Sequence, residues 1–194
     1  MRCRIWFLLF LAWPVAAAET LNVVIDEWPP YIEKAPPTYG VLSKVVQEAF
    51  AAESIIVELH FEPWKRVENG LDVQNYFSFG YVKTAEREAR WLFSEPIMRS
   101  QSILITNQRH RGFAWQGWGW GDLTSYRIGI TQAYSYGLAF EQQRQQLKLI
   151  SSYTDLISLR ALLHERVDLI LMESRVAKSL ISKNFSVEEQ RKFL

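Results

Sequence analysis

The sequence predicts an α/β protein of two lobes, each built on a doubly wound and mostly parallel sheet. Short β-branched apolar runs alternate with segments of helical periodicity, the order typical of strand–helix–strand units. A glycine- and tryptophan-rich stretch without periodicity, residues 109–121, separates two series of such units. We therefore expect one lobe over residues 19–103 and a second over residues 104–194.

The first 18 residues have the pattern of a secretory signal peptide. Arg2 and Arg4 precede an apolar run over residues 5–15, and three alanines offer small residues for cleavage. A membrane anchor is the alternative, but the run is shorter than the roughly 20 residues of a spanning helix and contains Pro14. We expect cleavage after residue 18 and export to the periplasm.

Charge and cysteine content narrow the partners of the mature chain. The sequence has 22 basic and 21 acidic residues, and the predicted cleavage removes two arginines, so positive and negative charges nearly balance. This balance gives no reason to expect nucleic acid or an anionic membrane as a partner. Cys3, the sole cysteine, lies in the signal segment, so neither a disulfide nor a thiolate metal site is expected.

The elements of the first lobe follow from periodicity. Apolar residues recur every three or four positions over residues 41–50, which predicts a helix. Strands are expected at residues 21–25, 55–61 and 76–81, where β-branched and aromatic residues gather and where prolines or glycines end the runs.

The second lobe repeats this alternation. Leu156, Leu159 and Leu163 share one helical face, and the other runs are short and apolar. We expect strands at residues 102–106, 127–131 and 167–172, and helices at residues 136–146, around 156–163, and at 176–181.

Arg87 is the first candidate ligand-binding residue. Thr84 lies three positions earlier, so its hydroxyl can lie beside the guanidinium, which holds a carboxylate through two parallel hydrogen bonds. The alternative is a helix that Thr84 caps and on whose solvated face Arg87 lies. Local chemistry alone favours this alternative.

Further candidates lie where predicted strands end. Thr131, Tyr134 and Ser135 belong to a strand-to-helix turn, where free backbone N–H groups attract an anion, although such turns are also common without a ligand. Glu173 lies at the C-terminal end of a strand, the edge at which open α/β sheets bind ligands, and its carboxylate can accept an ammonium group. A solvated loop acid is an equally good interpretation.

Aromatic residues gather at the ends of predicted elements. Rings in such positions can wall a pocket and stack on a cation or an apolar side chain, although any single ring can instead cap the core. As a set they favour a cleft. They are Trp28, Tyr31, Trp64, Tyr81, Tyr134 and Tyr136.

Signals of catalysis are weak. His60, His110 and His164 are scattered without metal-binding spacing, and the sequence has no nucleophile elbow, P-loop or dinucleotide fingerprint. We therefore expect a protein that binds a small molecule and uses no metal or other cofactor.

Two short motifs carry a family resemblance. Residues 84–87 (TAER) with residues 93–96 (FSEP) resemble the T-x-E-R…F-S-x-P signature of the amino-acid-binding class of bacterial periplasmic solute-binding proteins, which serve ABC importers. Residues 63–66 (PWKR), 134–137 (YSYG) and 167–173 are similar to other stretches of that family. The resemblance covers residues 21 to about 181 and implies the two-lobed periplasmic-binding-protein fold, with a ligand held between the lobes.

The resemblance also implies roles and partners. The arginine at the position of Arg87 grips the ligand carboxylate, so its loss should weaken binding far more than folding, and the acid at Glu173 meets the amine. An ABC permease is the expected partner, and a complete chain is expected to be a monomer. Ala133 stands where the family usually has glycine, and Glu173 where it usually has aspartate. The family continues into a segment that returns to lobe one; since this sequence stops at Leu194, we expect that return to be missing or shortened.

Two other functions remain open beside the capture of an amino acid or a related small zwitterion for import. Some members of the superfamily are dehydratases, which require a general acid or base in the cleft. Others act as sensors or accessory binding proteins without a role in transport.

Overall fold

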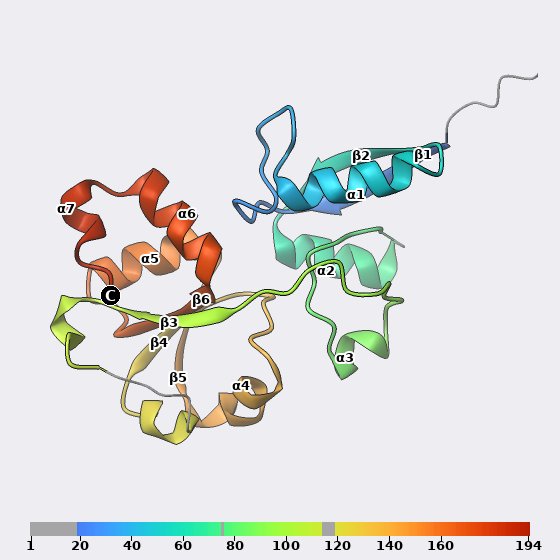
Figure 1. Ribbon diagram of the computed structural model, residues 1–194. Coiled ribbons are helices and arrows are strands. Elements are labelled where there is room, and N and C mark those ends of the chain that lie inside the picture. Colours follow the sequence, from blue (N-terminus) through green and yellow to red (C-terminus); the bar gives the residue numbers. More distant parts are fainter. Residues whose placement is uncertain (1–18, 75, 114–118) are drawn as a thin grey trace, which may run out of the picture.

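The structure is a computed structural model that describes residues 19–74, 76–113 and 119–194. The predicted signal peptide lies outside the described residues. The chain forms two α/β lobes, and the segment that leads into β3 (Ser102–Thr106) runs from one lobe to the other (Figure 1). Across the described ranges, no helix is both long and apolar enough to traverse a bilayer.

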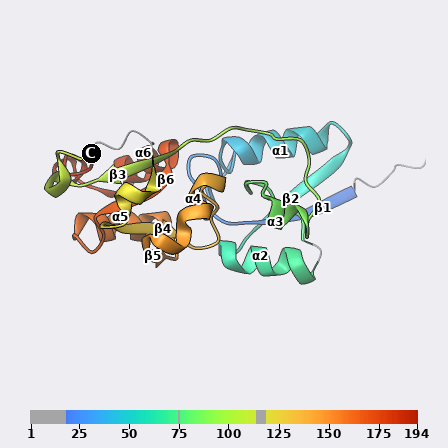
Figure 2. The same ribbon diagram turned by 90° about the horizontal axis from the view of Figure 1, so that it is seen from below.

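The first lobe is built on a pair of parallel strands, β1 (Glu19–Ile25) and β2 (Ile55–Phe61). Helices α1 (Val41–Ala51) and α2 (Trp64–Val73) lie on opposite sides of this pair (Figure 2). The short helix α3 (Ala85–Glu88) follows in the same lobe. Both strands end at the side that faces the second lobe, so the loops after them reach the junction between the lobes.

Gly40 fixes the loop between β1 and α1. Its φ of 90° lies in the left-handed region, and a Cβ added there would overlap the carbonyl group of Tyr31. The backbone of Tyr31 therefore packs directly against the start of α1, where its carbonyl accepts a hydrogen bond from Leu42 N at 2.9 Å. The Tyr31 side chain reaches the second lobe, where its hydroxyl donates to Glu173.

The second lobe contains a four-stranded sheet in the order β3–β6–β4–β5. Strands β4 (Arg127–Thr131), β5 (Lys148–Ser152) and β6 (Leu169–Glu173) are parallel, whereas β3 is antiparallel to β6. The sheet is therefore mostly parallel, as predicted. Because β6 is an inner and fully buried strand, its C-terminal residue Glu173 is brought to the edge of the sheet that faces the first lobe.

Helices cover both faces of this sheet. Ile170 and Met172 face the core under α5 (Asp155–Leu163) and α6 (Ser174–Asn184), whereas the alternate residues Leu169 and Leu171 pack into a second core beside α4. The first of these cores continues into lobe one, so the lobes are packed together. The other helical segments are α4 (Leu138–Gln143), α7 (Val187–Gln190) and the 3-10 turns η1 (Gln108–His110), η2 (Trp120–Leu123) and η3 (Arg144–Gln146).

The structure corrects two predicted elements. The strand predicted at residues 76–81 is wrong, because Phe77 forms only an isolated bridge with Val23 and Gly80, at φ 85°, turns the chain away. The helix predicted at residues 136–146 is shorter and begins after Gly137, whose φ is 93°. Helix α2 and strand β5 were not predicted from the sequence. The predicted limit between residues 103 and 104 falls inside β3, and the extents of the lobes remain a prediction.

Candidate ligand-binding cleft between the lobes

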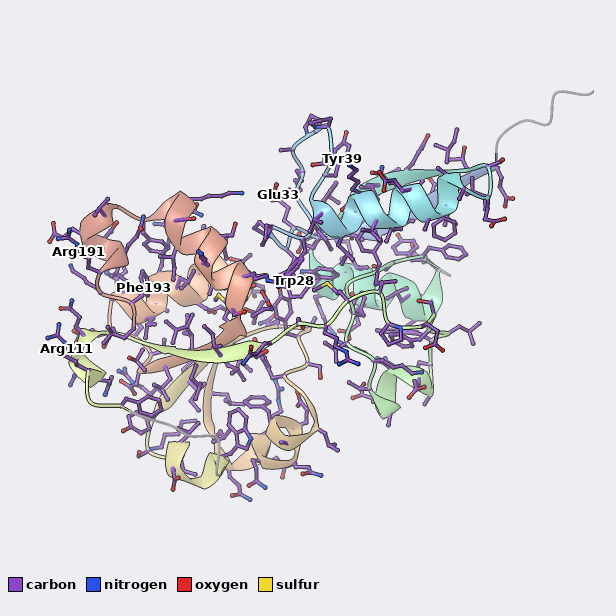
Figure 3. All side chains as sticks on the ribbon, viewed as in Figure 1. Trp28, Glu33, Tyr39, Arg111, Arg191 and Phe193 are labelled. Atoms are coloured by element: carbon purple, nitrogen blue, oxygen red, sulfur yellow. The ribbon has the colours of Figure 1, made fainter. Side chains whose placement is uncertain are left out.

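A cavity of about 430 Å³ lies between the lobes. Its walls come from loops that follow strands of both lobes, which is where open α/β sheets place their ligands. Trp28 stands at this junction (Figure 3). Seven of the ten predicted site residues line the cavity: Trp28, Trp64, Tyr81, Arg87, Tyr134, Ser135 and Glu173.

Arg87 is buried at one wall of this cavity. Its Nη1 donates to the carbonyl of Val82 at 3.0 Å, and its Nη2 donates across the lobes to the carbonyl of Ala133 at 2.7 Å. The Thr84 hydroxyl accepts from the backbone N–H of Arg87 at 3.2 Å and caps α3. The alternative interpretation, a helix that Thr84 caps with Arg87 on its solvated face, was therefore correct for the cap. It was wrong for Arg87, which is only 7% exposed.

Glu173 is also buried, so the interpretation as a solvated loop acid was wrong. Its Oε2 accepts from the backbone N–H groups of Arg175 and Val176, both at 2.8 Å, and so caps α6. Its Oε1 accepts from the Tyr31 hydroxyl at 3.1 Å. Tyr31 therefore lies behind the cavity wall, where it links the lobes through Glu173.

The turn after β4 forms the wall that lobe two contributes, and its Ala133 carbonyl contacts Arg87. Ala133 has a φ of 62°, a left-handed conformation that suits glycine better than alanine. Most backbone N–H groups of the turn are already engaged. The backbone N–H of Thr131 donates to the Tyr136 hydroxyl, and that of Gln132 donates to the Ser152 carbonyl. The backbone N–H of Tyr134 donates to the Thr131 carbonyl, and that of Tyr136 donates to the Glu141 carboxylate. The turn is therefore a poorer anion site than the sequence predicted.

Asp155 anchors this turn from behind. The Thr131 hydroxyl donates to Oδ1 of Asp155 at 2.6 Å, and the Tyr134 hydroxyl donates to Oδ2 at 3.2 Å. Thr131 therefore supports the wall instead of lining the cavity. Burial raises the pKa of Asp155 to about 6, although these hydrogen bonds act in the opposite direction.

Replacing Asp155 with Asn should change how stability depends on pH. The folded protein holds the Asp155 proton more tightly than the unfolded chain does. Protonated Asp155 therefore contributes to the free energy of unfolding, fully below the ordinary pKa of 3.8, and this contribution is lost as pH rises through about 6. The shift corresponds to about 3 kcal/mol. Urea unfolding at several pH values should show Asp155→Asn gaining on the wild type between pH 4 and 7. A constant difference would contradict this.

Aromatic rings form the rest of the cavity wall. The Tyr134 ring, from lobe two, meets the rings of Trp28 and Trp64, from lobe one, edge to face, each with centroids 6.4 Å apart. Tyr81 packs on Trp64 at 5.2 Å, also edge to face. Three polar atoms at this wall have no hydrogen-bond partner among the described residues: Trp28 Nε1, Trp64 Nε1 and Ser135 Oγ.

A larger hollow of about 770 Å³ lies on the other side of Trp64 and Tyr134. The ion pair between Glu33 and Lys183, at 2.6 Å, joins the lobes at its rim. Figure 3 shows Glu33 in the loop that approaches the second lobe. We place the candidate site in the smaller cavity, because Arg87 and Glu173 both line it.

Several residues of the site were missed by sequence reasoning. Glu68 lies behind Arg87, and Ser100 and Gln101 line the cavity from the segment that joins the lobes. None belongs to a motif, so only the folded chain brings them to the site. In the described part of the chain, no three His, Cys, Asp or Glu side chains cluster in a way that could hold a metal ion.

Comparisons with known proteins identify the fold. No family model and no curated protein matches the sequence. Among solved structures, an arginine transport system periplasmic binding protein from Legionella pneumophila has a TM-score of 0.70 and 18% identity over 91% of this chain and 78% of that one. A histidine kinase sensor domain with similarity to periplasmic binding proteins has a TM-score of 0.73 and 16% identity over 90% and 76%.

A third solved structure is an ancestral amino-acid-binding protein, a precursor of cyclohexadienyl dehydratase. It has a TM-score of 0.67 and 19% identity, and the match covers 84% of this chain and 75% of that one. These neighbours include binding proteins for amino acids, a sensor domain and a forerunner of an enzyme. At these sequence identities the structural similarity establishes the fold alone. This chain has the two-lobed periplasmic-binding-protein fold.

Proposed function

We propose that this protein is a periplasmic solute-binding protein that captures an amino acid or a related small zwitterion for an ABC importer. The observation that supports this most is the placement of Arg87 and Glu173, two buried groups of opposite charge, on the walls of one cavity between the lobes. Arg87 offers N–H donors to a carboxylate, and Glu173 offers a carboxylate to an ammonium group. The predicted signal peptide supports a periplasmic location.

The contacts between the lobes support a mechanism of closure. Arg87 with Ala133 and Tyr31 with Glu173 join the lobes at the cavity, and Glu33 with Lys183 joins them at the larger hollow. A ligand that contacts both lobes favours the closed arrangement by its differential affinity for it. The closed form would then be the one that a permease recognises.

Two neighbours suggest other uses of the same cleft. The histidine kinase sensor domain favours signalling as the second candidate function. A signalling protein would also need to bind a ligand without catalysing a reaction. The dehydratase precursor raises an enzymatic function. Among the described residues no histidine lines the cavity, and Asp155, whose pKa burial raises to about 6, accepts hydrogen bonds from Thr131 and Tyr134 through its two oxygens. These contacts favour binding over acid–base catalysis.

A thermal-shift screen of amino acids, small amines and organic acids, followed by calorimetry, tests the proposal. We expect at least one amino acid to raise the melting temperature and to bind at one site per chain. Tyr134→Ala should abolish this binding, whereas Tyr153→Ala, at a residue that is 77% exposed outside the smaller cavity, should not. Absence of saturable binding, or wild-type affinity in Tyr134→Ala, would refute the proposed site.

A further inference from the structure

The charges around the cavity are unbalanced. Arg87 is the one buried cation at its walls among the described residues, and it is accompanied by three buried or nearly buried carboxylates. Glu173 lines the cavity, Glu68 lies behind Arg87, and Asp155 is one hydrogen bond behind Tyr134. Lys65 and Arg175 are nearby but exposed, so water and salt screen them.

Glu68 partly neutralises Arg87, the residue expected to bind a ligand carboxylate. Its Oε1 lies 3.5 Å from Arg87 Nη2, and its side chain is 14% exposed. Its other oxygen lies 3.5 Å from Lys65 Nζ, at the surface. Burial and the charge of Glu68 raise the pKa of Tyr81, which lines the cavity, so the field of this carboxylate reaches the wall.

The groups that would favour an anion are largely occupied. The Arg87 guanidinium donates to two backbone carbonyls and stacks over the Tyr81 ring at 4.9 Å. Most N–H groups of the turn after β4 bond within the protein. In contrast, the cavity presents the rings of Trp28, Trp64 and Tyr134, and aromatic faces attract cations.

We propose that the cleft selects ligands with a net positive charge over neutral ligands of the same shape, and that Glu68 sets this preference by compensating Arg87. The inference rests on the proposed function and specifies its ligand class as a basic amino acid or related organic cation. The ligand carboxylate, where there is one, meets donors of Arg87, and the excess positive charge is balanced by Glu68, Glu173 and Asp155.

Calorimetry with four probes tests the preference in the wild-type protein. L-arginine and L-citrulline differ in one group, a guanidinium against a neutral urea, while agmatine lacks the carboxylate and L-glutamate carries net negative charge. We expect arginine to bind at least about tenfold more tightly than citrulline, because a desolvated guanidinium is attracted to the faces of aromatic rings. Glutamate should bind least tightly of the four. Agmatine should retain measurable affinity.

Two variants test the role of Glu68. In Glu68→Gln the preference for arginine over citrulline should fall by at least about threefold, because a unit charge behind the wall is lost. Glu86→Gln removes the same charge beside Arg87 from a side chain that is 85% exposed, and its preference should stay within about twofold of the wild type. Melting curves establish that both variants fold.

The outcomes separate the two proposals. If none of the probes and no other amino acid binds, the proposed function fails and the charge preference fails with it. If citrulline or glutamate binds as tightly as arginine, the proposed function stands and the charge preference is overturned, whether or not Glu68→Gln folds. If the preference is present but unchanged in Glu68→Gln, the role of Glu68 is refuted.

Discussion

Arg87→Ala should lose ligand affinity by about 2–5 kcal/mol, the cost typical of truncating one partner of a buried, hydrogen-bonded charge pair. The structure changes the expectation that folding would be little affected. Arg87 also satisfies the carbonyls of Val82 and Ala133 and compensates Glu68. We therefore expect an additional loss of about 1–3 kcal/mol in the free energy of unfolding, measured by urea denaturation without ligand.

Two variants separate these effects. Arg87→Lys keeps the charge but loses the planar fork, so it should fold better than Arg87→Ala and still bind worse than the wild type. Arg90→Ala removes a neighbouring arginine that pairs with Asp72 at 2.9 Å outside the cavity, and it should bind normally. Wild-type affinity in Arg87→Ala would show that Arg87 is a structural residue only.

Glu173→Ala should affect both stability and binding. It removes the cap of two backbone N–H groups at the start of α6 and the partner of the Tyr31 hydroxyl. Loss of such a cap costs about 1–2 kcal/mol, and the loss of the contact between the lobes adds to it. Chemical denaturation measures the first effect, and calorimetry with an amino acid measures the second.

Glu173→Gln serves as the matched variant, because its amide oxygen can still accept hydrogen bonds at the start of α6. It should keep most of the stability and lose affinity for ligands that carry an ammonium group by about tenfold or more, since the charge-assisted bond is gone. Tyr31→Phe should weaken the link between the lobes while leaving the α6 cap intact. Unchanged affinity in Glu173→Gln would exclude an ammonium contact at this residue.

Elements whose side chains face a continuous core were predictable from the sequence. Helix α1 and the buried run of β6 are local patterns, and the structure confirms both elements, although Val41 and Val45 of the apolar residues in α1 are exposed. The prolines at residues 29–30 and 63 ended strands as expected. Helix α2 was missed although Trp64, Val67 and Gly70 face the core at helical spacing, because Pro63 and Trp64 were interpreted only as a strand terminus. The surface-facing strand β5 has too few apolar residues to be recognised.

The candidate site could be predicted in part for the same reason. Rings at element ends and an acid at the end of a buried strand are visible in one local stretch of sequence. The partners that determine their chemistry come from distant segments: Glu68 from α2 meets Arg87, and Asp155 from α5 meets Thr131 and Tyr134. No spacing rule connects these residues, so the charge balance of the cavity becomes visible only in the folded chain.

A crystal structure of the protein with its tightest-binding amino acid tests the central claim most directly. The ligand should lie in the cavity bounded by Trp28, Trp64 and Tyr134, with its carboxylate within hydrogen-bonding distance of Arg87 and its ammonium group within hydrogen-bonding distance of Glu173. A ligand bound in the larger hollow or on the surface, with no contact to Arg87 or Glu173, would contradict the claim.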